Sequence, residues 1–519
     1  MSEIAVKNPM TGEVLYVVPE ADDAVIRHTF EAARRAFARI SAMTVRERVA
    51  ETLKIRDYIL AHREAIIDKI VAETGKCRTD ALTSEIFVIL DVIDYYRKNA
   101  EKILAVQRVS TPFVLFGKKS RICFEPLGTV LVISPWNYPL HLALVPCITA
   151  FVAGNAVVFK PSEYTPLRGL VEEILEGSGF LRHGIQVVYG GKDVGAKLID
   201  AKPAKILFTG SVRSGRKVME LASRHLIPVE LELGGKDPMV VFEDVNLERT
   251  VNGALWGALT NCGQACTSVE RIYVQEGLYD QFVVKLREKI EKVTYPGHGG
   301  ELPDAGSLDV GCITPAFQLD VIRAHLDEAR QNGAKILTGG VPMNGSHVVP
   351  PTMVVDVDPS LKLAAEETFG PVVTVMKFKT EEEAVKLAND SEYGLSASVW
   401  SGDLERGWRV ARQIEAGNVN VNNVMITEGN SALPFGGVKN SGFGRYKGPF
   451  GLHAFSNIKS VMVDKQGSRI ESNWFPYTKE KYQAFSKLIE LLYGGGPLGF
   501  LKALVWGLRL ELLTRRQRL

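Results

Sequence analysis

Residues 128–137 read GTVLVISPWN, and four similar apolar runs follow: NAVVFKPSE (155–163), IQVVYGG (185–191), KILFTGS (205–211) and PVELELGGK (228–236). Gly, Pro or Ser bounds each run, and segments of helical periodicity such as TPLRGLVEEILEGSG alternate with them. Uninterrupted apolar runs of this length are typical of parallel strands that helices cover on both faces. The alternation therefore predicts a doubly wound α/β sheet.

The regions on either side of this sheet extend the prediction. Residues 22–108 place apolar side chains at three- and four-residue steps, which predicts amphipathic surface helices. Beyond residue 236, a second alternating region contains the runs ERIYVQ, KILTGG, PVVTVMKF, SASVWS and NVNVNN, with helical segments between them. We therefore expect two α/β lobes with a cleft between them.

The overall composition narrows the class of protein. In 519 residues, 62 Lys and Arg nearly balance 60 Asp and Glu, and the basic residues form no long stripe, so binding to nucleic acid is not expected. The six cysteines are scattered and the first residues are polar, so we expect a cytoplasmic protein with free thiols. Only Cys262 and Cys266 are close in sequence, and no neighbouring ligands complete a metal site, so no metal is expected.

Three motifs carry candidate catalytic groups. Cys266 lies in the segment NCGQACTSVERIYV, between a predicted helix and a predicted strand, where a thiol can face a cleft. Glu232 ends an apolar strand in LELGGK, where a carboxylate must pair with a cation such as Lys236, meet water or act as a base. Asn137 stands between two prolines in SPWNYP, where its amide can donate to an oxyanion or simply form a turn. Each of these residues, taken alone, also fits an ordinary structural role.

Two strand ends suggest a cofactor site, although neither G-x-G-x-x-G nor a phosphate loop is present. In FTGSVRSG, Gly210 and Ser211 open a turn and a helix starts near Gly215, a pattern that suits a diphosphate but is equally typical of a helix cap. In FKPSE, Lys160 and Glu163 follow another strand. Glu163 favours NAD because a carboxylate can accept both ribose hydroxyls and repels a 2′-phosphate. The neighbouring lysine leaves NADP open, and a surface ion pair is the alternative for both residues.

Taken in order, PWN, KPSE, FTGS, ELGGK, GQAC, EETFGPV and PFGGVKNSGFGR resemble the aldehyde dehydrogenase superfamily, over about residues 8–463. The resemblance implies oxidation of a small-molecule aldehyde to a carboxylate by NAD(P), in a homodimer or a dimer of dimers. It implies that Cys266 is the nucleophile and Glu232 the general base. Asn137 would be the oxyanion donor, together with the backbone N–H of Cys266.

The resemblance also implies positions around the cofactor and the substrate. The residues expected at the cofactor are Trp136, Lys160, Ser162, Glu163, Gly210, Ser211, Gly215, Leu233, Glu367 and Phe369, and those expected to wall the aldehyde pocket are Tyr138 and Phe435. The implied domains are a cofactor-binding domain (1–107 and 127–234), a catalytic domain (235–445), an oligomerisation element (108–126 and 446–466) and a C-terminal helical extension (467–519).

One position departs from the family pattern, and two other functions stay open. Tyr446 follows GFGR, where many members carry a Glu that assists the proton path of the general base. A CoA-acylating dehydrogenase is the first alternative, and Glu232 argues against it because that chemistry needs no hydrolytic base. A non-catalytic structural relative is the second, and it predicts the loss of Cys266 or Glu232.

The C-terminal tail lies beyond the part that most soluble members share. Residues 497–514 are mostly apolar but contain Lys502, Arg509 and Glu511, so they are a weak candidate for a membrane span. With Trp506 among leucines and basic residues at the end, the tail suits a helix at a membrane surface, or equally one packed on a partner subunit or on its own lobe. It is similar to the tail of fatty aldehyde dehydrogenases, which suggests a medium- or long-chain aliphatic aldehyde and possible membrane association.

Overall fold

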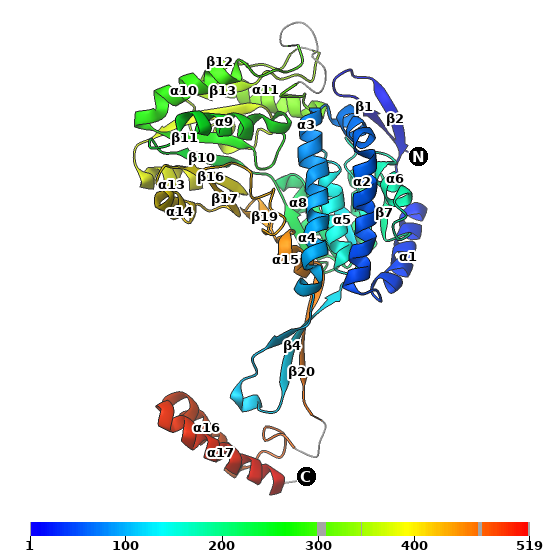
Figure 1. The fold of residues 1–519 in the computed structure, drawn as a ribbon, viewed down its shortest axis with the longest axis vertical. Coiled ribbons are helices and arrows are strands. Elements are labelled where there is room, and N and C mark those ends of the chain that lie inside the picture. Colours follow the sequence, from blue (N-terminus) through cyan, green and yellow to red (C-terminus); the bar gives the residue numbers. More distant parts are fainter. Residues whose placement is uncertain (1, 298–307, 344, 466–469, 517–519) are drawn as a thin grey trace. The chain divides into compact units, whose positions relative to one another are not determined.

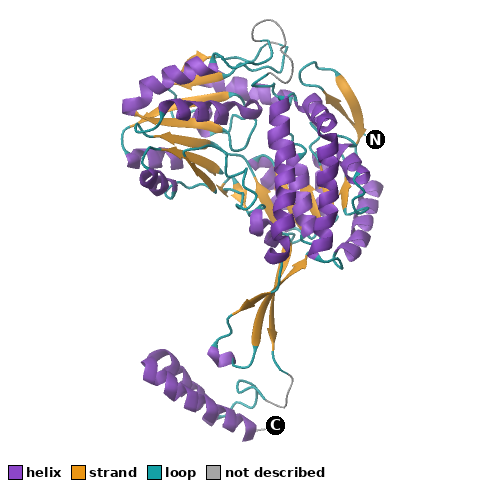
Figure 2. Cartoon of the chain, in the orientation of Figure 1, coloured by secondary structure: helices purple, strands orange, loops and turns teal. Residues whose placement is uncertain are grey.

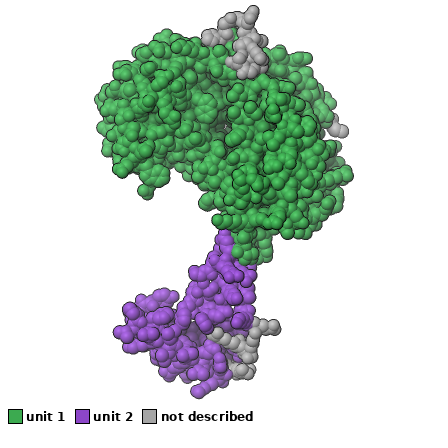
Figure 3. Space-filling view, in the orientation of Figure 1, with its two compact units in different colours: residues 1–106, 123–459 green, residues 107–122, 460–519 purple. Residues whose placement is uncertain are grey.

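A computed structural model of the chain describes residues 2–297, 308–343, 345–465 and 470–516. The chain forms two compact units, which Figure 3 colours separately. The first unit comprises residues 1–106 and 123–459, and the second comprises residues 107–122 and 460–519. Parts of the expected oligomerisation element and tail, at residues 466–469 and 517–519, lie outside the described residues.

One lobe of the first unit is built on a six-stranded sheet of order β19-β9-β8-β5-β6-β7 (Figure 1). All neighbouring strands are parallel except β19, which runs antiparallel to β9. Strands β5 and β6 are buried at every position, as expected for strands covered on both faces. The strands are β5 (Thr129–Ile133), β6 (Ala156–Lys160), β7 (Ile185–Val187), β8 (Lys205–Thr209), β9 (Val229–Glu232) and β19 (Gly442–Phe443).

The helices of this lobe include the predicted amphipathic ones. They are α1 (Asp23–Ile40), α2 (Val45–Thr74), α3 (Arg78–Asp80), α4 (Phe87–Ile103), α5 (His141–Val152), α6 (Leu170–Gly177), α7 (Lys192–Asp200), α8 (Val212–Ser223) and α15 (Gly448–Ala454). Helix α2 begins with a capping box between Thr44 and Glu47 and ends at Gly75, whose φ of 69° favours glycine. Between α3 and α4 the chain forms a π-helix, η1 (Ala81–Ile86), which the helical periodicity did not predict.

The other lobe is built on a seven-stranded sheet of order β12-β13-β14-β11-β10-β16-β17, and Figure 2 shows helices around both sheets. Only β12 is antiparallel to its neighbour. The strands are β10 (Asp237–Val241), β11 (Val269–Gln275), β12 (Lys335–Thr338), β13 (Thr352–Val355), β14 (Val372–Phe378), β16 (Ser396–Trp400) and β17 (Asn418–Val421). The helices are α9 (Leu247–Leu259), η3 (Thr260–Gly263), α10 (Glu276–Ile290), α11 (Ala316–Gln331), α12 (Lys362–Ala365), α13 (Glu381–Asn389) and α14 (Leu404–Ala411).

The prediction of two α/β lobes is confirmed, with some elements missed. Strands β10 and β13 carry apolar runs too short to stand out from their surroundings, yet both lie inside the sheet. Two small antiparallel pairs were also not predicted: β1 (Glu3–Lys7) with β2 (Val14–Pro19), and β15 (Tyr393–Gly394) with β18 (Val438–Lys439). The domain boundary at residue 235 stays a prediction.

The second unit contains a helical hairpin and most of a three-stranded sheet. The sheet has the order β20-β4-β3, with β3 (Gln107–Val109), β4 (Lys119–Pro126) and β20 (Ser456–Val463), and a short helix, η2 (Phe113–Leu115), precedes β4. The tail forms α16 (Lys479–Gly494) and α17 (Gly496–Arg516), which pack on each other. Among the described residues, no helix combines the length and the apolar character that crossing a membrane requires.

Candidate active site

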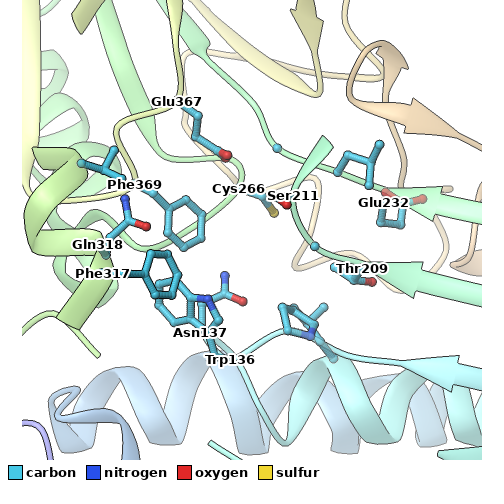
Figure 4. Close-up of a pocket in the computed structure, with 16 residues that line it drawn as sticks. Trp136, Asn137, Thr209, Ser211, Glu232, Cys266, Phe317, Gln318, Glu367 and Phe369 are labelled. Carbon is cyan, nitrogen blue, oxygen red and sulfur yellow. The ribbon is translucent and has the colours of Figure 1, made fainter. Parts of the chain in front are cut away.

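A cavity of about 210 Å³ in the first unit brings together most of the residues that the sequence singled out (Figure 4). The three candidate catalytic residues line it: Cys266 before β11, Glu232 at the end of β9 and Asn137 after β5. Figure 4 shows Cys266 between Glu232 on one side and Asn137 and Phe369 on the other. Side chains that are far apart in the sequence therefore meet around one space. Its lining residues are Pro135, Trp136, Asn137, Leu142, Thr209, Gly210, Ser211, Glu232, Leu233, Gly234, Cys266, Phe317, Gln318, Val321, Glu367 and Phe369.

The loop before β11 holds Cys266 through an unusual backbone. Asn261 and Cys262 both have positive φ, at 51° and 58°, which is rare for residues other than glycine. The carbonyl oxygen of Cys266 lies against Gly235, where a Cβ would come within 2.3 Å of it. A glycine is therefore required beside the nucleophile. Cys266 is half-buried, whereas Cys262 is fully buried in the core.

The electrostatic surroundings of Cys266 favour its protonated thiol. Burial raises the pKa of the Cys266 thiol well above its usual range, and the carboxyl groups of Glu428, Glu367, Asp237 and Glu232 raise it further. A thiolate is the nucleophilic form of cysteine. Attack on a substrate by Cys266 therefore needs a base or a positive charge that is supplied during the reaction.

Glu232 is buried and has no partner among the described residues. Neither carboxylate oxygen has a hydrogen-bond partner, and its side chain is 3% exposed. Burial raises the pKa of Glu232 well above its usual range, while the cation Arg445 lowers it in part. The expected alternative, an ion pair with Lys236, is wrong because Lys236 pairs with the buried Glu270. An unpartnered carboxyl group that faces a cavity is suited to exchanging a proton with water.

Asn137 is held from both its side chain and its main chain. Its Nδ2 donates one hydrogen bond to the carbonyl oxygen of Gln264 at 3.0 Å, which leaves the second hydrogen free to face the cavity. Its own carbonyl oxygen accepts hydrogen bonds from Lys76 Nζ at 2.8 Å and from Asn261 Nδ2 at 3.2 Å. Because Gln264 belongs to the loop of the nucleophile, these bonds couple Asn137 to Cys266.

The two glycines after Glu232 make room for Glu367. The N–H of Gly235 donates to Glu367 Oε1 at 3.0 Å, and a Cβ on Gly234 would lie 2.2 Å from Glu367 Oε2. Burial and the charge of Glu270 raise the pKa of Glu367 to about 8. The carboxylate of Glu270 also accepts a hydrogen bond from the N–H of Phe369, which has a φ of 51°. Glu270 thus fixes the segment that presents Glu367 and Phe369 to the cavity.

The turn between β8 and α8 places two of its three predicted residues at the cavity. Gly210 and Ser211 line the cavity at the start of α8, and Ser211 also caps that helix by accepting a hydrogen bond from the N–H of Ser214. Gly215 does not line the cavity. A Cβ there would lie 2.5 Å from Leu233 Cδ2, so this glycine allows α8 to pack closely on Leu233, which does line it.

Three of the residues expected at the cofactor lie at the end of β6 and do not line this cavity: Lys160, Ser162 and Glu163. Lys160 and Glu163 form an ion pair at 3.6 Å, and Lys160 Nζ also donates to the carbonyl oxygen of Pro161. Within this pair the Lys160 side chain is buried, whereas the Glu163 side chain is 34% exposed. Glu163 and Tyr164 line a separate groove of about 690 Å³.

The two predicted walls of the aldehyde pocket lie beside the cavity, and other residues line it. Tyr138 packs with Leu142 and Ala265, and Phe435 contacts Tyr446 edge-on at 5.6 Å between ring centroids. Burial and the charge of Glu232 raise the pKa of Tyr446 well above its usual range, so this side chain is neutral beside the carboxyl group. Tyr446 therefore cannot serve as the base that a glutamate would be.

Seven of the residues that line the cavity were not among the predicted site residues: Pro135, Leu142, Thr209, Gly234, Phe317, Gln318 and Val321. Three of them lie in the first turns of α11. The sequence predicted this helix but not the direction in which it faces the cavity. The ring of Phe317 lies 6.4 Å from that of Trp136, and Trp136 in turn contacts Phe369 edge-on at 5.2 Å. Among the described residues, no group of three or more His, Cys, Asp or Glu side chains is arranged to hold a metal ion.

Comparison with known proteins agrees with this geometry. The sequence model of the aldehyde dehydrogenase family matches residues 1–461. The chain belongs to the aldehyde dehydrogenase family. It is 42% identical to a 4,4'-diapolycopene aldehyde oxidase of a Methylomonas species, over 95% of this chain and 92% of the relative.

The names of similar proteins with solved structures include both nicotinamide cofactors. This aldehyde dehydrogenase is 30% identical to a Mycobacterium tuberculosis aldehyde dehydrogenase complexed with NAD+, with a TM-score of 0.83 over 89% of this chain and 94% of the other. It is also 30% identical to an E. coli NADP dependent enzyme, with a TM-score of 0.84 over 89% and 95%. The chain is an NAD(P)-dependent aldehyde dehydrogenase.

The residues of this aldehyde dehydrogenase fit a nicotinamide dinucleotide. The N-terminus of α8 opens on the cavity at Gly210 and Ser211, where backbone N–H groups suit a diphosphate. Glu367 offers a carboxylate for ribose hydroxyls, and the aromatic rings of Trp136 and Phe369 offer flat apolar surfaces for the nicotinamide.

Proposed function

We propose that this enzyme oxidises an aldehyde to a carboxylate by way of a thioester on Cys266, with Glu232 as the hydrolytic base and Asn137 as the oxyanion donor. The observation that carries the proposal is that these three side chains, from three separate segments, line a single cavity. The same cavity holds the carboxylate of Glu367 and the ring of Phe369, which suit the nicotinamide end of the cofactor.

The reaction begins at the sulfur. The Cys266 thiol first loses its proton to solvent water. The thiolate then forms a bond to the aldehyde carbon, and the carbonyl electron pair moves to oxygen, where Asn137 Nδ2 and the backbone N–H of Cys266 donate hydrogen bonds. The bound nicotinamide supplies the hydride acceptor for the oxidation. The carbonyl then re-forms as a thioester on Cys266.

Hydrolysis of the thioester uses Glu232. Its carboxylate takes a proton from water, and the resulting hydroxide attacks the thioester carbon, so that sulfur leaves as a thiolate and the acid is released. The absence of any partner for Glu232 among the described residues leaves both oxygens available for this water. This arrangement favours hydrolysis over transfer of the acyl group to coenzyme A, and an active thiol and base argue against a non-catalytic relative.

The test compares two cysteines that stand four residues apart. Cys266→Ala should abolish aldehyde-dependent NADH formation, and mass spectrometry should find no acyl adduct. Cys262→Ala is the matched control because Cys262 is buried in the core and does not line the cavity, so its rate should stay near that of the parent enzyme. Full activity of Cys266→Ala would refute the proposed mechanism.

For the substrate, we propose a medium- or long-chain aliphatic aldehyde. The lining of the cavity includes the apolar residues Leu142, Phe317 and Val321. The name of the Methylomonas relative also points to a large apolar aldehyde for that protein. The kcat/KM for hexadecanal should exceed that for acetaldehyde by at least tenfold, since each buried methylene favours binding by about 0.8 kcal/mol. Equal values for the two aldehydes would contradict this assignment.

We also propose that the tail contacts a membrane surface. Five apolar residues form one stripe of α17 and are 56% to 72% exposed: Leu498, Leu501, Val505, Leu508 and Leu512. The basic residues Lys502 and Arg509 are exposed beside the stripe, which suits anionic lipid headgroups.

Sedimentation with lipid vesicles tests the tail. The enzyme should sediment with phosphatidylcholine vesicles that contain phosphatidylserine, and the double variant Leu501→Asp/Val505→Asp should stay in solution. Val284→Asp is the control because Val284 is an equally exposed apolar residue on α10. If the tail variant sediments as well as the control, the tail does not bind the vesicles.

Finally, we propose a homo-oligomer, a dimer or a dimer of dimers, that assembles through β20. This strand lies at the edge of its sheet among the described strands, and its exposed side chains include Ile458, Met462 and Val463. An apolar edge strand is suited to pairing with a second copy of the chain. Light scattering should give the mass of a dimer or tetramer, and Ile458→Lys/Met462→Lys should shift it toward the monomer. A parent enzyme with the mass of a monomer would rule out the proposal.

A further inference from the structure

A fully buried ion pair lies behind the oxyanion donor. Lys76 Nζ and Glu85 Oε1 are 2.7 Å apart, and both side chains are 0% exposed. Lys76 follows Gly75 at the end of α2, and Glu85 lies in the π-helix η1. Neither residue lines the cavity, so neither is placed to touch the substrate.

The ion pair forms hydrogen bonds with the main chain of the turn that contains Asn137. Lys76 Nζ donates to the carbonyl oxygen of Asn137 at 2.8 Å. Glu85 Oε2 accepts hydrogen bonds from the N–H groups of Leu140 and His141, at 3.0 and 2.7 Å. Both ends of the turn are thus tied to one ion pair.

A second set of hydrogen bonds connects Asn137, through the loop that contains Cys266, back to the end of α2 near Lys76. Gln264, whose carbonyl oxygen holds Asn137 Nδ2, accepts on Oε1 a hydrogen bond from the N–H of Thr314 at 2.8 Å. The hydroxyl of Thr314 donates to the carbonyl oxygen of Thr74 at 2.7 Å, two residues before Lys76. Asn137 is therefore fixed from two directions by one continuous set of hydrogen bonds.

Stability alone does not account for such a pair. Removing two charges from water costs several kcal/mol per ion, and apolar residues of the same size often stabilise a core as well or better. A π-helix is also an uncommon element that occurs often at functional sites. Unlike apolar residues, Lys76 and Glu85 form directional hydrogen bonds, and these bonds fix the position of the turn.

We propose that Lys76 and Glu85 are positioning residues for the reaction: they fix the main chain of Asn137 so that its free Nδ2 hydrogen points to the carbonyl oxygen of the bound aldehyde. This inference rests on the proposed role of Asn137. Misplacing a donor by about 1 Å can cost ~100-fold in rate.

The test is the double variant Lys76→Met/Glu85→Gln. It leaves no unpaired buried charge, and the glutamine keeps an acceptor for the N–H groups of Leu140 and His141. We expect a Tm within a few degrees of the parent, unchanged NADH affinity by fluorescence and a kcat reduced roughly 10- to 100-fold. Tyr16→Phe is the control, since it removes a partly buried hydrogen bond to Glu73 outside the cavity and should lower Tm without lowering kcat. Glu85→Gln alone is the second variant should the double variant not fold.

A double-mutant cycle with Asn137→Ala separates the possible failures. If the pair acts through Asn137, its substitution should slow the parent enzyme but cause no further loss in the Asn137→Ala background. Full kcat in the Lys76 and Glu85 variants, or equal losses in both backgrounds, would overturn the inference while leaving the role of Asn137 intact. Full kcat in Asn137→Ala itself would overturn the proposed role of Asn137, and the inference with it.

Discussion

Replacing Glu232 with glutamine should stop the reaction at the thioester. Neither oxygen of Glu232 has a hydrogen-bond partner among the described residues, and glutamine has nearly the same size. The substitution therefore breaks no hydrogen bond among the described residues and introduces no buried charge, so Tm should not fall. The whole effect should lie in the step that needs a proton acceptor.

The size of the effect follows from general base catalysis. Loss of a positioned base costs about 10²- to 10⁴-fold in rate, which corresponds to about 2.7 to 5.4 kcal/mol in the activation free energy. Because burial raises the pKa of Glu232, the parent rate should also rise with pH as this group ionises. That pH step should be absent from the variant.

Rapid mixing with an aldehyde and NAD+ measures the prediction. Glu232→Gln should release one equivalent of NADH per site in a fast burst and then turn over slowly, and mass spectrometry should find the acyl group on Cys266. A variant with no burst would show that Glu232 is needed before hydride transfer. A variant with the parent kcat would refute the role of Glu232 altogether.

Three further predictions test the site and the fold. Gly235→Ala should lower Tm by several degrees because its Cβ would lie 2.3 Å from the backbone oxygen of Cys266, and thermal unfolding measures this. The KM for NAD+ should fall as pH rises toward 8, where Glu367 ionises, and Glu367→Gln should remove that dependence in steady-state kinetics. Burial raises the pKa of Glu73 to about 7 from a usual 4.5, so the chain takes up a proton on this group when it folds between pH 4.5 and 7. The contribution of Glu73 to the free energy of unfolding therefore falls as the pH rises through this range. Glu73→Gln should make Tm depend less on pH between pH 5 and 7. Unchanged Tm in Gly235→Ala, or pH profiles identical to the parent in the two glutamine variants, would contradict the respective prediction.

The order of the elements could be predicted from local patterns, and these patterns also marked the main site residues as candidates. Apolar runs that end in Gly, Pro or Ser predicted the parallel strands, and functional groups at the ends of parallel strands meet at one edge of a sheet. Glu232, Asn137 and Gly210 were candidates for this reason, and Cys266 was one because its loop joins a helix to a strand. Their catalytic and cofactor roles were implied only by the resemblance to the family, because each residue taken alone also fits a structural role.

The partners of these residues depended on the tertiary structure. Lys236 stands four residues from Glu232 yet pairs with Glu270, because β10 and β11 lie side by side in the sheet. The ion pair between Lys76 and Glu85 involves the turn of Asn137, more than fifty residues away, and no periodicity relates these segments.

The sequence by itself determined which elements form and which residue types stand at their ends, because burial and turn formation depend on neighbours in the chain. Only the tertiary structure decided which side chains wall the cavity, as with Phe317 and Val321, which line it, and Tyr138 and Phe435, which do not. The physical reason is that the packing of one helix or strand against another decides which of its side chains face the cavity. That packing depends on the orientation of whole elements, which neighbours in the sequence do not fix.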